Sequence, residues 1–190
     1  MPRIFLAVSF SVAVTRKIAE EVERRKQLLA DAGFRLAWVP AANLHVTLRF
    51  IGTVADELVE GIIGAAGKVG RRHAPFEARA FGVGVFPSLA QPSVLWVGVQ
   101  PSPALTALQT DVEAAMVDLG LEREGRVFQP HVTVGRVKES RGGQDAAAWM
   151  NGPLDAGSST VSELIVYESK TRAAGAEYVA RARVPLHKEK

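Results

Sequence analysis

The sequence predicts an α+β protein in which helices cover the outer faces of antiparallel strands. Three observations support this fold class: three long segments have helical periodicity, runs of β-forming residues cluster between them, and prolines and glycines separate those runs. The 190 residues are 47% hydrophobic and 23% charged, so the chain is large enough to bury a core and too apolar to be disordered. No low-complexity linker divides it, and the Gly142-Gly143 pair is expected in a surface loop.

The apolar run at 4–14 predicts a buried first strand at 3–9 that leads into a helix. A signal peptide is the alternative, but the run is short, follows a single arginine and has no small-residue cleavage site. No apolar run approaches the roughly 20 residues that span a bilayer. We therefore expect a cytoplasmic protein without membrane contact.

Three segments have the apolar periodicity of amphipathic helices. In the first of them, apolar residues recur every four positions and Gly33 provides a natural stop. The run Arg24-Arg25-Lys26 is expected on the solvent side of that helix. The predicted helices cover 11–33, 55–70 and 102–119.

Short segments rich in β-branched and aromatic residues lie between the helices and predict strands. They are bounded by prolines and glycines, which mark turns. Clustered strands between long helices favour antiparallel sheets with helices outside. The expected strands, after the first, cover 36–39, 44–51, 76–85, 94–99, 132–137, 161–168 and 177–184.

The composition excludes several classes of function. The chain has no cysteine, which excludes a disulfide scaffold, a thiolate metal site and a cysteine nucleophile. The net charge of +3 and the pI near 9.4 suit an anionic substrate without identifying one.

A repeated tripeptide is the strongest functional signal. Two of the four histidines begin His-Val-Thr, namely His45-Val46-Thr47 and His131-Val132-Thr133, and both copies lie in predicted strands. Because alternate side chains share one face of a strand, the histidine and threonine of each copy point the same way. The two copies predict an internally duplicated fold, with both pairs facing one cleft.

Two imidazoles fit phosphodiester chemistry at neutral pH, since one can accept a proton from the attacking oxygen while the other protonates the leaving oxygen. The threonine hydroxyls can donate hydrogen bonds to phosphoryl oxygens. A structural role for the histidines is disfavoured by the repeat, and two histidines without nearby Asp, Glu or Cys leave zinc short of ligands. We expect no metal and no cofactor, and no catalytic role for His73 or His187.

Several segments, together spanning nearly the whole chain, match one known pattern: 3–8, 38–40, 43–52, 81–87, 94–99 and 128–136. They resemble the 2H phosphoesterase superfamily with its paired His-x-Thr-x elements, and more closely the LigT-like (ThpR) family of RNA 2′,3′-cyclic phosphodiesterases, also called 2′-5′ RNA ligases. Two positions depart from that pattern. Ser93 stands where relatives often have arginine, and Ser11 stands where they often have proline.

The resemblance implies one bilobal domain over 1–190, with two pseudo-twofold-related lobes, motifs near 43–52 and 128–137, and an active cleft between the lobes. It implies metal-free, ATP-independent opening of a terminal 2′,3′-cyclic phosphate to a 2′-phosphate, and in some members reversible 2′-5′ ligation of tRNA halves. The expected partners are RNA ends, tRNA fragments or nucleoside cyclic phosphates, and we expect a monomer.

The resemblance also implies site residues. His45 and His131 would be catalytic, and Thr47, Thr133 and Arg136 would bind phosphate. Strict alternation puts Arg136 on the face opposite His131, and Gly135 would permit a bulge that turns it inward.

Two aromatic residues beside the motifs, Phe50 and Phe128, are either base-stacking platforms or core residues. Two other functions stay open beside the RNA enzyme. One is a 2H enzyme that acts on a small nucleotide, such as ADP-ribose cyclic phosphate or an oligoadenylate. The other is a non-catalytic RNA-end binding module, which two matched proton carriers disfavour.

Overall fold

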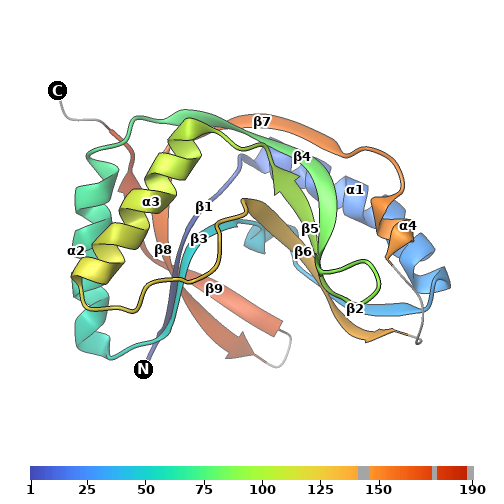
Figure 1. The fold of residues 1–190 in the computed structure, drawn as a ribbon, viewed down its shortest axis with the longest axis horizontal. Helices are drawn as coiled ribbons and strands as arrows, with labels where there is room; N and C mark the ends of the chain where they lie inside the picture. Colours follow the sequence, from blue (N-terminus) through green and yellow to red (C-terminus); the bar gives the residue numbers. More distant parts are fainter. Residues whose placement is uncertain (141–145, 173–174, 188–190) are drawn as a thin grey trace.

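The computed structural model describes residues 1–140, 146–172 and 175–187. Within them a nine-stranded antiparallel sheet curls into an arch, and this confirms the predicted α+β class (Figure 1). The predicted loop at Gly142-Gly143 lies outside the described residues. None of the helices in the described part of the chain combines the length and apolarity needed to cross a membrane.

The strands cover most of the segments expected from the sequence. They are β1 (Arg3–Val8), β2 (Phe34–Trp38), β3 (Val46–Thr53), β4 (Phe76–Pro87), β5 (Pro92–Val99), β6 (His131–Ser140), β7 (Asp155–Val161), β8 (Glu163–Arg172) and β9 (Gly175–Pro185). The helices are α1 (Val12–Asp31), α2 (Asp56–Gly70), α3 (Pro103–Asp118) and α4 (Ala147–Met150), with a 3-10 turn at Ala41–Asn43.

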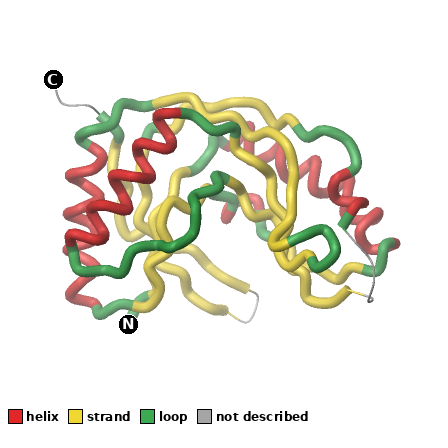
Figure 2. The backbone as a smooth tube through the Cα atoms, viewed as in Figure 1, coloured by secondary structure: helices red, strands yellow, loops and turns green. Residues whose placement is uncertain are grey.

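The sheet has two halves that meet at the strands bearing the repeated tripeptide. Its strand order is β7-β4-β5-β6-β3-β1-β8-β9, with β2 paired to the other part of β6. One residue pair, Val46 opposite Val132, joins β3 to β6. Helices α2 and α3 pack on the half that contains β3, β8 and β9, and α1 and α4 pack on β2, β4 and β7. Figure 2 shows these two helix layers at opposite ends of the arch.

Capping residues explain why α1 and α3 begin where the sequence predicts. The Ser11 hydroxyl accepts a hydrogen bond from the backbone N–H of Val14, and the Ser102 hydroxyl accepts one from Leu105. Gly33 follows α1 with a φ of 81°, the left-handed conformation that suits glycine at a helix end. The apolar faces of α1 and α3 are buried against the sheet.

The prediction for Arg25 is wrong, because this residue is buried and not on the solvent side of α1. Its guanidinium lies 2.6 Å from a Glu21 carboxylate oxygen and 5.8 Å from the Trp149 ring centroid. Position 25 shares the buried face of α1 with Val22 and Leu29, so helical periodicity overrides the polarity of the side chain.

The sequence analysis also missed β7 and α4. The expected strand at 161–168 joins the last residue of β7 to most of β8. Aspartate, glycine and serine occupy four of the seven positions of β7, so its local β propensity is low, and pairing with β4 from Phe76 to Phe81 determines its conformation instead.

Candidate active site

The histidine and threonine side chains of both tripeptides lie on the concave side of the arch. The strands that follow or carry them, β3 and β6, are antiparallel neighbours. Their central residues, Val46 and Val132, are buried in the core. Two adjoining cavities occupy the concave side: one of about 590 Å³ is bordered by His131, and one of about 330 Å³ by His45. The structure thus brings the four motif residues together, and both threonines border both cavities.

The two histidines make the same hydrogen bond to the chain. His45 donates from Nδ1 to the carbonyl of Asn43, and His131 donates from Nδ1 to the carbonyl of Gln129, each at 2.7 Å. A carbonyl oxygen can only accept, so Nδ1 holds the proton of each neutral ring and Nε2 is the basic nitrogen. The Nε2 of His45 lies 3.1 Å from the Thr47 hydroxyl.

Burial lowers the pKa of both imidazoles below the ordinary 6.5, against the opposing effect of each carbonyl hydrogen bond. The positive charge of Arg136 lowers both pKa values further. A protonated His131 also lowers the pKa of His45. Repulsion between two imidazolium charges disfavours the doubly protonated pair, so the pair can hold a single proton.

Aromatic rings support each imidazole. His45 packs against Phe5, with ring centroids 4.9 Å apart, and against the edge of Tyr178 at 5.2 Å. His131 packs against Phe86 at 5.0 Å, with Trp96 behind at 6.1 Å. Apolar packing of this kind fixes the rings and removes water from them, which is the origin of the lowered pKa values.

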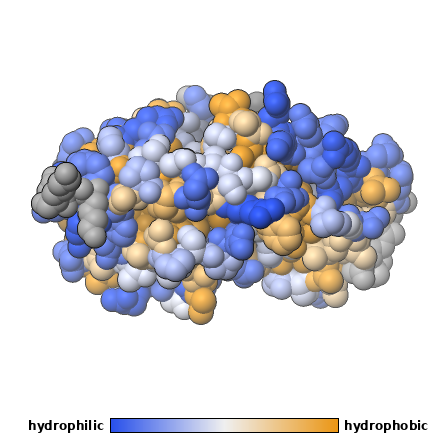
Figure 3. Space-filling view, turned by 90° about the horizontal axis from the view of Figure 1, so that it is seen from above, coloured by the Kyte–Doolittle hydropathy of each residue, from blue (hydrophilic) through white to orange (hydrophobic). Residues whose placement is uncertain are grey.

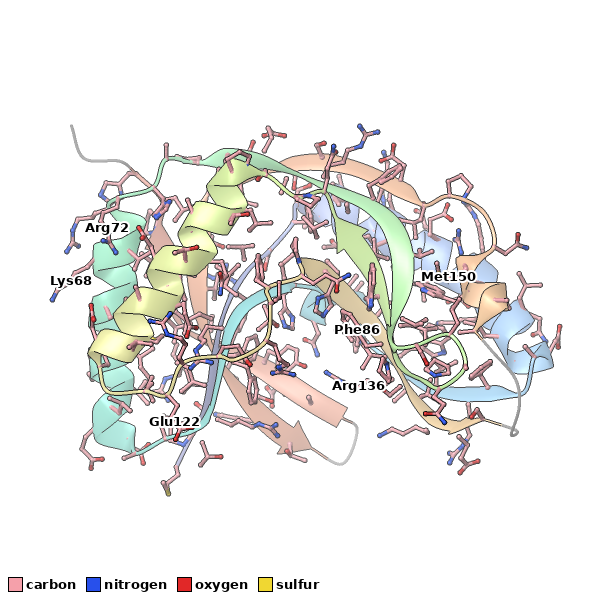
Figure 4. The ribbon with its side chains drawn as sticks, viewed as in Figure 1. Lys68, Arg72, Phe86, Glu122, Arg136 and Met150 are labelled. Atoms are coloured by element: carbon pink, nitrogen blue, oxygen red, sulfur yellow. The ribbon has the colours of Figure 1, made fainter. Side chains whose placement is uncertain are left out.

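A bulge in β6 turns Arg136 toward the cleft. Trp96 of β5 is opposite Thr133, and the residue before Trp96 is opposite Gly135. Val134 therefore has no partner in β5. Arg136 therefore returns to the face of Thr133 and borders both cavities. Figure 4 shows Arg136 and Phe86 directed into the space beneath the arch.

Gly135 is closely packed at this point of the strand. A Cβ at this position would lie 3.1 Å from the Trp38 ring, tighter than most real contacts. The bulge expected near Gly135 is thus present, with its unpaired residue one position earlier, at Val134.

The same irregularity occurs in β3. Ala7 of β1 is opposite Thr47, and the residue before Ala7 is opposite Arg49. Leu48 therefore has no partner in β1. Phe50 consequently occupies the position in β3 that Arg136 occupies in β6, five residues after the histidine. Phe50 is 41% exposed and also borders both cavities.

Phe128 has an intermediate place. It packs against the core and is partly buried, and it also borders the larger cavity. Ser93 borders that cavity too, and its hydroxyl donates to the carbonyl of Phe86 at 3.0 Å. His73 is hydrogen-bonded to Asp111 and borders neither cavity.

The sequence analysis did not single out two residues that border the His45 cavity, Arg3 and Tyr178. For Arg3 a signal was available, because alternation along the first strand puts it on the face of Phe5. Among the described residues, no group of three or more His, Cys, Asp or Glu side chains is arranged to hold a metal ion.

This curled sheet, with a His-x-Thr strand on each side of its midline, defines a protein of the 2H phosphoesterase class. The chain belongs to the 2′-5′ RNA ligase superfamily, whose family model matches residues 14–173. Similarity to characterised sequences is extensive. An RNA 2′,3′-cyclic phosphodiesterase of Methanothermobacter thermautotrophicus is 34% identical over 179 residues, which cover 93% of this chain and 94% of the relative.

A second RNA 2′,3′-cyclic phosphodiesterase, from Archaeoglobus fulgidus, is 35% identical over 136 residues, covering 72% of this chain and 73% of the relative. Solved structures share the fold. The protein TT0787 of Thermus thermophilus superposes with a TM-score of 0.81 at 24% identity, covering 99% of this chain and 100% of that one. Escherichia coli LigT complexed with 3′-AMP gives 0.78 at 24% identity, with coverage of 97% and 98%.

Proposed function

We propose that this protein is an RNA 2′,3′-cyclic phosphodiesterase that opens a terminal ribose 2′,3′-cyclic phosphate to a 2′-phosphate. The observation that carries the proposal is the pair of identically hydrogen-bonded histidines, which border adjoining cavities of one cleft. The activity named for the relatives from Methanothermobacter thermautotrophicus and Archaeoglobus fulgidus supports it.

The proposed reaction needs two proton transfers. His45, neutral at Nε2, accepts a proton from water as the water oxygen forms a bond to phosphorus. The bond from phosphorus to the 3′-oxygen breaks, and His131 donates its Nε2 proton to that oxygen. We assign His45 as the base because its hydrogen bond to the chain is part-buried, whereas that of His131 is exposed, so burial disfavours the charged form more strongly at His45. Proton exchange with solvent then restores the starting state.

Thr47, Thr133 and Arg136 would bind the phosphate. Both hydroxyls border both cavities, so they can donate to the nonbridging oxygens on which charge develops. The Arg136 guanidinium supplies a fixed cation at the same place. Phe50 and Phe128 border the larger cavity and would provide apolar surfaces for a base.

Ligation would use the same groups. If the 5′-hydroxyl of a second RNA takes the place of the attacking water, the product is a 2′-5′ linkage. We further propose that the chain acts as a monomer and that its single bilobal domain has an internal duplication. The matching bulges of β3 and β6 support the duplication.

The test is turnover of adenosine 2′,3′-cyclic phosphate with identification of the product by phosphorus NMR. We expect 2′-AMP, and a loss on the order of 10²–10⁴ in rate for His45→Ala and for His131→Ala. The matched control is His187→Ala, because this exposed histidine borders neither cavity.

Near-wild-type turnover by either folded cleft variant would contradict the mechanism, and 3′-AMP as the product would contradict the leaving-group assignment. Parallel assays of ADP-ribose cyclic phosphate and an oligoadenylate address the small-nucleotide alternative. Binding of the cyclic nucleotide without turnover would instead support a non-catalytic module.

A further inference from the structure

We propose that Arg3, stacked on Phe50, binds the backbone phosphate on the 5′ side of the reacting nucleotide, so that the preferred substrate is an RNA end and not a free cyclic nucleotide. This inference rests on the proposed function and specifies its substrate. It assigns a second phosphate subsite, separate from the one at the histidines.

The first strand holds Arg3 in a fixed position. The backbone N–H of Val54 donates to the Pro2 carbonyl at 3.0 Å, and Arg3 pairs with Thr53 in the β1–β3 ladder. Alternation along β1 puts Arg3 on the face of Phe5, the residue that supports the His45 ring. The Arg3 side chain accordingly borders the same cavity as His45.

The charge of Arg3 is not neutralised by an acidic side chain. Its guanidinium lies 5.0 Å from the centroid of the Phe50 ring, and no carboxylate in the described part of the chain is within ion-pair distance of it. Other arginines on the sheet do have such partners, including Arg79 with Asp155. An accessible guanidinium without a carboxylate, placed over an aromatic ring, is suited to bind phosphate.

Arg136 already provides a cation for the reacting phosphate, so Arg3 is available to bind a second phosphate. Arg136 borders both cavities and lies with the two threonines, whereas Arg3 borders only the smaller cavity. A nucleoside 2′,3′-cyclic phosphate has one phosphate, but the last nucleotide of an RNA has another on its 5′-oxygen. The Arg3 subsite therefore separates an RNA end from a mononucleotide.

Phe50 links the two subsites. It borders both cavities, and Arg3 approaches it from the smaller one. A base in the larger cavity can then stack on the Phe50 ring while the RNA strand passes toward Arg3.

Figure 3 views the molecule from above and shows hydrophilic side chains interspersed with small hydrophobic patches on that face.

The test compares kcat/KM for adenosine 2′,3′-cyclic phosphate with that for the dinucleotide ApA ending in a 2′,3′-cyclic phosphate. Wild-type protein should prefer the dinucleotide. Arg3→Ala should lower its kcat/KM roughly tenfold or more, as expected for a lost hydrogen bond to a charged group, and lower that for the mononucleotide much less. Arg3→Lys should retain part of the preference.

Salt dependence gives an independent readout. Loss of one phosphate contact should reduce the slope of log(kcat/KM) against log salt by about 0.7 for the dinucleotide only. The matched control is Arg79→Ala, which removes a guanidinium 5.7 Å from the Phe81 ring and outside both cavities. This variant should behave as wild type.

Several outcomes would overturn the inference. They are a wild-type protein without preference for the dinucleotide, an Arg3→Ala variant that loses activity equally on both substrates, and one that keeps the full preference. These results leave the proposed function intact, since the mononucleotide is still hydrolysed. Failure of wild-type protein to hydrolyse either substrate would instead overturn the proposed function together with the subsite.

Discussion

A single methyl group added at Gly84 should disturb the cleft from behind. Gly84 of β4 is opposite Trp96 of β5, and the indole ring covers its Cα. A Cβ at Gly84 would lie 2.0 Å from Cζ2 and 2.2 Å from Cη2 of Trp96, where ordinary contacts are 3.4–4 Å. The ring must therefore move by about 1 Å or more, because the two strands are paired and cannot separate freely.

That movement would reach the proposed general acid. The Trp96 ring centroid is 5.3 Å from that of Phe86, which packs against His131. Overpacking of a core typically costs about 1–3 kcal/mol of unfolding free energy, so we expect Gly84→Ala to be destabilised by that amount. Misplacement by about 1 Å can cost on the order of 10²-fold in rate, and we expect kcat to fall by roughly 10–10².

Urea denaturation and cyclic-nucleotide turnover measure the two effects. The denaturation midpoint should fall with an unchanged slope, and the double variant Gly84→Ala/Trp96→Leu should be less destabilised than the sum of the single variants. Gly64→Ala is the control: this exposed position of α2 has open space around it, so the variant should gain about 0.5–1 kcal/mol. Wild-type stability and turnover of Gly84→Ala would refute the reasoning.

Three further predictions concern the cleft. The pH profile of kcat/KM should be bell-shaped, because one histidine must be neutral and the other protonated. Its optimum should lie on the acid side of 6.5, because burial lowers the pKa of both His45 and His131. A profile flat from about pH 5 to 9 would contradict this. Activity should survive excess EDTA because imidazoles supply both proton transfers, and loss with chelator that a divalent ion restores would contradict it. Thr47→Ala and Thr133→Ala should each cost less in kcat than the histidine variants, and Arg136→Ala should raise KM as well as lower kcat; steady-state kinetics with unchanged KM would exclude a binding role for the arginine.

Features of the fold that depend on local pattern could be predicted from the sequence. Strand alternation was enough to put the histidine and the threonine of each His-Val-Thr copy on one face, whereas the shared cleft depends on the pairing of β3 with β6. The ends of α1 and α3 followed from capping serines and Gly33. By contrast, β7 has little β propensity of its own, and its pairing with β4 could not be deduced locally.

Positions set by register were harder to predict. Strict alternation along β6 would put Arg136 on the face of the sheet opposite to the one that it occupies. The side chain lies on its actual face because Val134 has no partner in β5. Arg25 shows the same limit for a helix, because its carboxylate and carbonyl partners come from packing that the charged run does not reveal. Alternation gives the face of Arg3, but the proposed role of Arg3 depends on its proximity to Phe50, which is far away in sequence.

The matched bulges explain how two equivalent histidines can acquire different roles. The hydrogen bonds that their Nδ1 atoms make to the chain are the same, so those bonds do not separate a base from an acid. The strands differ at the fifth residue after each histidine, where the bulge delivers Phe50 from β3 and Arg136 from β6 to the cleft. An aromatic ring and a cation recognise different parts of a nucleotide, its base and its phosphate. Under the proposed function, a substrate therefore has one favoured orientation in the cleft, and that orientation decides which imidazole meets the attacking oxygen and which meets the leaving oxygen.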